Sequence, residues 1–103
     1  MKLEEEFTNA LEGTVKAAKS KNYIPTYFIQ MLAEHGGVET ARRLLARQEP
    51  QTGLFELYYR DLLHESMEAV VLQDKFKSLF TEKESAEAHR RLDELGYFKN
   101  GKK

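Results

Sequence analysis

The segment that most constrains this chain is residues 23–47, YIPTYFIQMLAEHGGVETARRLLAR, which predicts two helices joined by a pair of glycines. Pro25 suits a first helical turn, because the amide hydrogen that proline lacks would be unpaired there anyway. Gly36 and Gly37 can adopt positive φ, which lets one helix stop and the next begin at once. Two helices joined so tightly must cross at a steep angle, so this segment predicts a helix–Gly-Gly–helix corner.

The rest of the chain repeats its apolar residues at helical spacing and has no convincing strand. We therefore predict an all-α fold, a compact single domain of five or six short helices that occupies residues 1–98. Residues 99–103 read as a flexible basic tail. The predicted helices span residues 3–18, 25–35, 38–47, 54–63, 65–72 and 81–95, with a further turn within 74–80.

The helix expected after residue 80 has the clearest boundaries. Thr81 and Glu84 have the spacing of a capping box, in which each side chain bonds a free backbone amide of the first turn. Gly96 suits the position just after the helix.

The apolar stripes of the predicted helices also indicate core residues, and they place Phe28 and Leu32 in one core. We expect Leu45 and Leu92 to share that core.

Charge and composition narrow the classes of function. The chain has 16 lysines and arginines against 17 acidic residues, a net charge of −1, which disfavours nucleic acid as a partner but leaves it open. The acidic N-terminal sequence MKLEEEF does not resemble a signal peptide, and no apolar run is long enough to cross a membrane. We expect a cytoplasmic protein without membrane attachment, and the absence of cysteine excludes disulfides and thiol nucleophiles.

No pattern in the sequence predicts catalysis. His35, His64 and His89 are the only imidazoles, and none has the spacing of a zinc-binding HExxH motif. No serine lies in a nucleophile elbow, and the glycine pair lacks the flanking residues of a phosphate loop. We therefore expect no enzyme activity, no catalytic residue, no cofactor and no metal.

Several short motifs occur in order along residues 23–97. They are Tyr-x-Pro-x-x-Phe-x-x-Met from Tyr23, Gly-Gly-Val-x-x-Ala-x-x-Leu-Leu from Gly36, Gly53-Leu54-Phe55, Glu68-Ala69-Val70-Val71, Leu79-Phe80-Thr81, and Arg91-Leu92 before Gly96-Tyr97. This stretch resembles a helical module of uncharacterised bacterial proteins, which often lies at the C-terminal end of longer chains. The resemblance implies a shared fold and no catalytic site. It does not include the first helix, and the chain departs from the usual pattern at residues 62–66.

The residues most typical of an interaction surface are Tyr58, Tyr59 and Arg60, because tyrosine and arginine are enriched where interfaces bind most strongly. Being adjacent on a helix, the two tyrosines are expected to split, one buried and one partly exposed. Arg43 and Arg47 form a charged ridge with Glu39, which can neutralise Arg43. This ridge reads as a solvated face, a protein contact or a DNA contact.

Two functions follow from these patterns, and a third possibility is a purely structural cap of a longer polypeptide. The first is a non-catalytic protein-interaction module, a small adaptor, inhibitor or regulatory subunit that binds a larger bacterial protein. The alternative is a helix-turn-helix DNA-binding protein whose recognition helix would be residues 38–47 and would present Glu39 and Thr40 to the bases. The sequence names neither the partner nor the oligomeric state.

Overall fold

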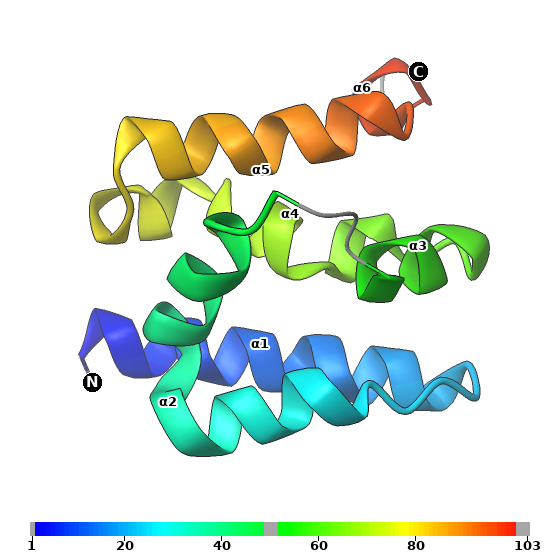
Figure 1. The fold of residues 1–103 in the computed structure, drawn as a ribbon, viewed down its shortest axis with the longest axis horizontal. Helices are drawn as coiled ribbons and strands as arrows, with labels where there is room; N and C mark the ends of the chain where they lie inside the picture. Colours follow the sequence, from blue (N-terminus) through cyan, green and yellow to red (C-terminus); the bar gives the residue numbers. More distant parts are fainter. Residues whose placement is uncertain (1, 49–51, 101–103) are drawn as a thin grey trace.

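The computed structural model describes residues 2–48 and 52–100 of the protein. Within these ranges the chain forms α-helices and short 3-10 helices and no strand, which confirms the predicted all-α class (Figure 1). The α-helices are α1 (Leu3–Ser20), α2 (Thr26–Leu45), α3 (Thr52–Tyr59), α4 (Met67–Val71), α5 (Glu82–Glu94) and α6 (Tyr97–Asn100), and the 3-10 helices are η1 (Leu63–Glu65) and η2 (Asp74–Leu79). None of the helices in these ranges combines the length and the apolar character that a membrane crossing requires.

The helices are stacked in three levels (Figure 1). At the bottom of the view α1 and the first half of α2 lie side by side, in the middle lie α3 and α4, and at the top α5 leads into α6. The second half of α2 turns upward and brings its C-terminal end near α5. Because the short α4 packs on both α1 and α5, the three levels share one interior.

The turn within α2 occurs at the predicted glycine pair. Gly36 has φ 78° and ψ 173°, a conformation that is essentially restricted to glycine, and this confirms the predicted corner. Gly37 plays a different part, because its backbone lies directly against Thr8 of α1. One glycine therefore bends the chain and the other allows two helices to approach closely.

The core forms around Phe7 of α1, which is fully buried. Its ring contacts Phe76 and Phe80 edge to face, with ring centroids 5.1 Å apart in both pairs. Of the residues expected in the core, Leu45 belongs to this cluster, while Phe28 and Leu32 are only partly buried and pack against it. Leu92 is fully buried on α5 but is not part of the same cluster.

Two predicted helix boundaries were wrong. The helix expected to reach residue 63 ends at Tyr59, because Asp61 adopts a left-handed conformation with φ 62° that reverses the chain. The helix expected to begin at residue 65 begins instead at Met67, since the Ser66 hydroxyl accepts a hydrogen bond from the amide of Ala69 and so caps it.

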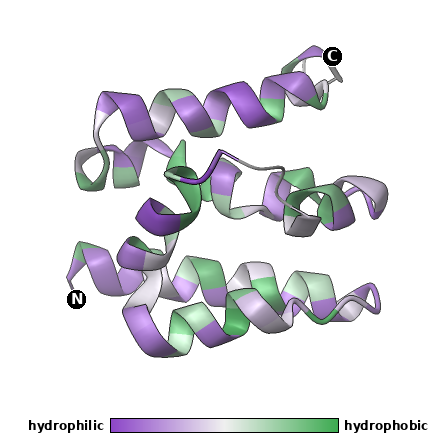
Figure 2. Ribbon diagram, viewed as in Figure 1, coloured by the Kyte–Doolittle hydropathy of each residue, from purple (hydrophilic) through white to green (hydrophobic). Residues whose placement is uncertain are grey.

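At the C-terminal end, α5 begins with the predicted capping box between Thr81 and Glu84. Figure 2 shows that α5 is the most hydrophilic of the long helices. Only a narrow apolar face of α5 is therefore available to pack against the other helices. The first two residues of the expected tail, 99 and 100, lie in α6, and the other three lie outside the described residues.

Candidate functional site

The predicted tyrosine pair lies at the end of α3, and both rings are exposed. Tyr58 is 43% and Tyr59 is 76% accessible, with ring centroids 5.6 Å apart, so the expectation that one ring is buried was wrong. The inward positions of this short helix are filled by Leu54 and Leu57. Phe55 is also exposed, and with the tyrosines it forms a set that we call the α3 aromatic face: Phe55, Tyr58 and Tyr59.

Arg60, the third residue of the predicted cluster, anchors α3 to neighbouring segments. Its guanidinium donates hydrogen bonds to the carboxylate of Glu56 and to the carbonyl of Lys21 at the end of α1. It also lies 5.0 Å from the centre of the Tyr23 ring. Arg60 therefore holds the base of the α3 aromatic face in position and has little freedom of its own.

The two predicted ridge arginines point in different directions. Arg43 is exposed on α2, and its Nε atom lies 2.9 Å from Glu39 Oε2, as the sequence spacing indicated. Arg47 follows the end of α2 and turns toward Tyr27, donating to the tyrosine hydroxyl with its guanidinium carbon 5.1 Å from the ring centre. The structure therefore separates Arg47 from Arg43.

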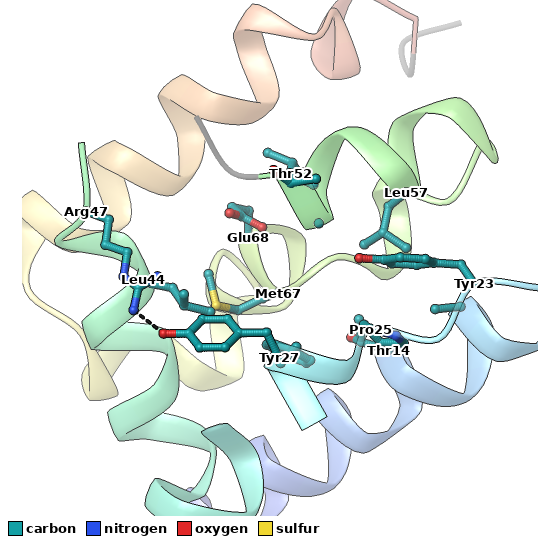
Figure 3. Close-up of a pocket in the computed structure, with 14 residues that line it drawn as sticks. Thr14, Tyr23, Pro25, Tyr27, Leu44, Arg47, Thr52, Leu57, Met67 and Glu68 are labelled. Atoms are coloured by element: carbon teal, nitrogen blue, oxygen red, sulfur yellow. Dashed lines mark hydrogen bonds between the residues drawn. The ribbon is translucent and has the colours of Figure 1, made fainter. Parts of the chain in front are cut away.

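A pocket of about 400 Å³, which no sequence pattern indicated, opens between α2 and α3 (Figure 3). Most of its lining is apolar and includes Leu54 of α3 and Met67 of α4. Tyr27 and Arg47 form its rim on one side, and Tyr23 projects into it from the other. The pocket brings together five segments that are far apart in the sequence.

A buried carboxylate, that of Glu68, also lines the pocket. Glu68 of α4 is only 4% accessible, and its Oε2 atom lies 3.1 Å from Arg91 Nη1. Burial raises the pKa of this carboxyl group above its usual value, while a hydrogen bond from its own backbone and the charge of Arg91 act in the opposite direction. Burial likewise raises the pKa of the Tyr23 phenol, and the nearby Glu56 carboxylate adds to the effect.

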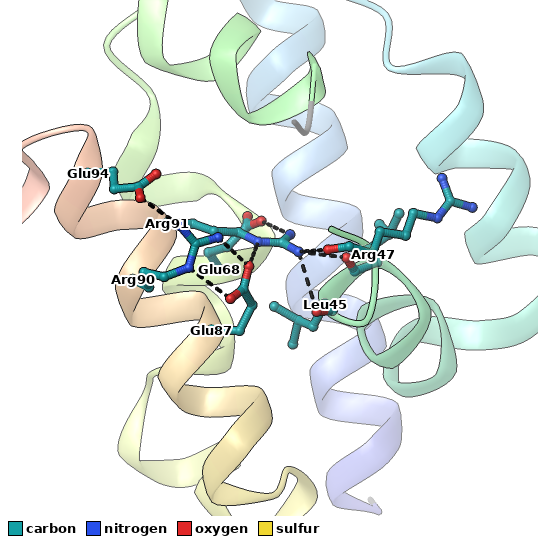
Figure 4. Close-up of polar contacts among 8 residues, drawn as sticks. Leu45, Arg47, Glu68, Glu87, Arg90, Arg91 and Glu94 are labelled. Atoms are coloured by element: carbon teal, nitrogen blue, oxygen red, sulfur yellow. Dashed lines mark hydrogen bonds and ion pairs between the residues drawn. The ribbon is translucent and has the colours of Figure 1, made fainter. Parts of the chain in front are cut away.

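Arg91 connects three parts of the fold (Figure 4). Besides Glu68 it binds Glu87 on its own helix at 2.7 Å, and its Nη2 atom donates to the carbonyls of Leu44 and Arg47 at 2.9 and 3.0 Å. Arg91 itself is buried, with only 6% of its surface accessible. It adds a donor to carbonyls at the C-terminal end of α2, where partners within the helix run out.

The carboxylate of Glu87 is shared between two arginines of α5. Both of its oxygens accept hydrogen bonds from Arg90, and Oε2 also accepts one from Arg91. The hydrogen bonds from Arg90, followed by those from Arg91, lower the pKa of Glu87 to about 2 in spite of its partial burial. This arrangement stabilises α5 and its attachment to the fold.

The histidines do not form a reactive group. His35 and His64 each lie beside the neighbouring glutamate in the chain, Glu34 and Glu65, at 3.7 Å, and His89 stacks on Phe98 with ring centroids 4.2 Å apart. Within residues 2–48 and 52–100, no three acidic, histidine or cysteine side chains gather as metal ligands would.

No family model matches the chain, and no curated protein or solved structure shows significant similarity to it. The resemblance of residues 23–97 to a bacterial helical module stays a prediction.

Proposed function

We propose that this protein is a non-catalytic protein-interaction module of the bacterial cytoplasm, an adaptor, inhibitor or regulatory subunit that binds a larger protein. The observation that carries the proposal is the α3 aromatic face, on which three neighbouring aromatic side chains are exposed on a helix of eight residues. Large aromatic rings exposed together favour a site that is covered by a partner.

The α3 aromatic face has the properties of an interface centre. Tyrosine contributes a large contact area with few rotatable bonds, so little conformational entropy is lost when a partner covers it. The face is also held in place, because Leu54 and Leu57 are buried beneath it and Arg60 ties the end of α3 to α1. A fixed surface loses less free energy on binding than one that must first become ordered.

DNA binding has less support from the same structure. Thr40, which a recognition helix would present to the bases, is fully buried, and Arg43 is paired with Glu39. The bend at Gly36 takes a single residue, whereas a helix-turn-helix motif uses a turn of three or four residues. These features favour a protein partner.

The experiment compares three forms of the protein as bait in an extract of the native host. They are the parent, the double variant Tyr58→Ser/Tyr59→Ser, and Phe98→Ser, which removes an exposed ring of α6. We expect a specific protein to be retained by the parent and by the Phe98 variant, and lost from the tyrosine double variant.

The affinity of the recovered partner is then measured for single variants. Tyr58→Ala or Tyr59→Ala should weaken binding by at least ~2 kcal/mol if that ring is an anchor, while the melting temperature stays close to that of the parent. Equal binding by all variants would show that the partner uses another surface. Salt-sensitive retention of the parent on duplex DNA, without a protein partner, would favour the alternative.

A further inference from the structure

We propose that the pocket between α2 and α3 binds a small amphipathic carboxylate, a molecule with one anionic group and an apolar body. In the proposed arrangement the carboxylate lies at the rim beside Arg47 and Tyr27, and the apolar body fills the space toward Met67 and Leu54. This site is distinct from the α3 aromatic face, which occupies the other side of α3.

The size and lining of the pocket suit such a ligand. Its volume of about 400 Å³ lies within the range of small-molecule sites, which are mostly apolar with a few polar groups that fix orientation. Here the buried side chains of Leu44, Leu54 and Met67 supply the apolar surface. An aliphatic chain or an aromatic ring would be removed from water against these groups.

The sign of the ligand charge follows from the arginines. The chain contains six, and five of them lie within 4.0 Å of a glutamate carboxylate. Among the described residues Arg47 is the arginine without a carboxylate partner, and its side-chain hydrogen bond goes to the neutral hydroxyl of Tyr27. A guanidinium beside an apolar cavity binds a carboxylate more strongly than a neutral acceptor, because the hydrogen bonds are then assisted by charge.

Glu68 in the pocket wall limits where the carboxylate of the ligand can lie. Glu68 is a poor neighbour for a second carboxylate, because the Arg91 guanidinium beside it already donates to Glu68, to Glu87 and to the carbonyls of Leu44 and Arg47. The anionic group is therefore expected at Arg47 and the apolar body toward α4. The Tyr23 hydroxyl, to which no described residue hydrogen-bonds, can bind one further polar atom of the ligand.

The test uses three probes with the same chain length: octanoate, octan-1-ol and octylammonium. Each is titrated into the protein while backbone amide resonances are followed by NMR. We expect saturable shifts with octanoate at Tyr23, Phe28, Leu57 and Met67, and an affinity for octanoate on the order of tenfold higher than for octanol. Octylammonium should bind more weakly than either.

Two variants connect the binding to the pocket. Arg47→Gln should lower the affinity for octanoate about tenfold and leave that for octanol unchanged, whereas Arg43→Gln, on the outer face of α2, should change neither. Gly53→Leu should prevent binding of all three probes by filling the cavity. This glycine is exposed at the pocket, and a Cβ on it would lie 3.6 Å from the Tyr23 hydroxyl oxygen, an ordinary contact that the fold tolerates.

Several results would overturn the proposal. They are an absence of saturable binding by octanoate, equal binding of octanoate and octylammonium, or binding that neither Arg47→Gln nor Gly53→Leu alters while both variants keep the melting curve of the parent. Shifts at the same amides on addition of the protein partner, with none from octanoate, would assign the pocket to the protein interface. The protein-binding function would then stand while the carboxylate site would not.

Discussion

The backbone amide of Gly37 donates a hydrogen bond to the hydroxyl of Thr8 over 3.0 Å, and this contact fixes the distance between α1 and α2. A Cβ on Gly37 would lie 2.6 Å from Thr8 Oγ1 and 2.7 Å from Thr8 Cα. Backbone atoms cannot move aside as the end of a flexible side chain can. The two helices therefore cross where only a hydrogen atom fits.

Gly37→Ala is expected to destabilise the protein by on the order of 3 kcal/mol, because α1 and α2 must separate to make room for the methyl group. Gly13→Ala is the matched control, since a Cβ at that position in α1 would meet nothing within 4 Å. It should raise stability by up to about 1 kcal/mol through helix propensity. Urea unfolding followed by circular dichroism measures both changes, and equal stabilities of the two variants would contradict the close contact.

Gly36→Ala tests the bend itself. A Cβ on Gly36 would meet nothing within 4 Å, so the cost of the substitution comes from the backbone conformation at φ 78°. We expect a loss of about 1–3 kcal/mol. Unchanged unfolding would mean that the bend in solution differs from the one described.

Phe7→Ala is expected to cost about 3–5 kcal/mol, since it removes a fully buried ring that contacts two others. Phe55→Ala, the same change on the exposed side of α3, should stay within about 0.5 kcal/mol of the parent. Phe28→Ala should cost less than Phe7→Ala, because Phe28 is partly buried and faces the pocket. Thermal unfolding of the three variants gives the order directly.

The sequence predicted the long helices, the corner and the cap of α5 because each depends on residues close together in the chain. It did not predict that Tyr58 and Tyr59 are both exposed or that Arg91 is buried, because burial depends on what the rest of the fold places over a helix face. One signal was present for Glu68, which is the only charged residue in the apolar run MEAVV. A carboxylate in such a run needs a buried partner, although the sequence does not indicate which arginine supplies it.

Stability should fall in acid through Glu87. Its pKa is lowered from the usual 4.5 to about 2 in the folded protein. Ionised Glu87 therefore adds its full amount to the free energy of unfolding above about pH 4.5, and this amount is lost as the pH falls toward 2. The difference in melting temperature between the parent and Glu87→Gln should therefore shrink over this interval. Glu94→Gln removes the other carboxylate that pairs with Arg90 and leaves the pair of Glu87 with Arg91 intact. This variant should lose stability in acid as the parent does.

Arg91→Met is expected to destabilise the protein by about 3–5 kcal/mol, because Glu68 would remain buried without its partner. The carbonyls of Leu44 and Arg47 would also lose the hydrogen bonds that Arg91 donates. Arg90→Met, the adjacent change on the exposed side of α5, should have a much smaller effect. Denaturant unfolding distinguishes the two, and similar losses would indicate that Arg91 is more accessible in solution than described.

Arg91 also determines when the protein can complete its fold during synthesis. A ribosome makes α4 before it reaches residue 91, so the carboxylate of Glu68 has to wait for the guanidinium that pairs with it in the finished fold. Until then this carboxylate depends on water, because burying it without its partner is unfavourable. Completion of the fold is thereby linked to the emergence of α5 from the ribosome.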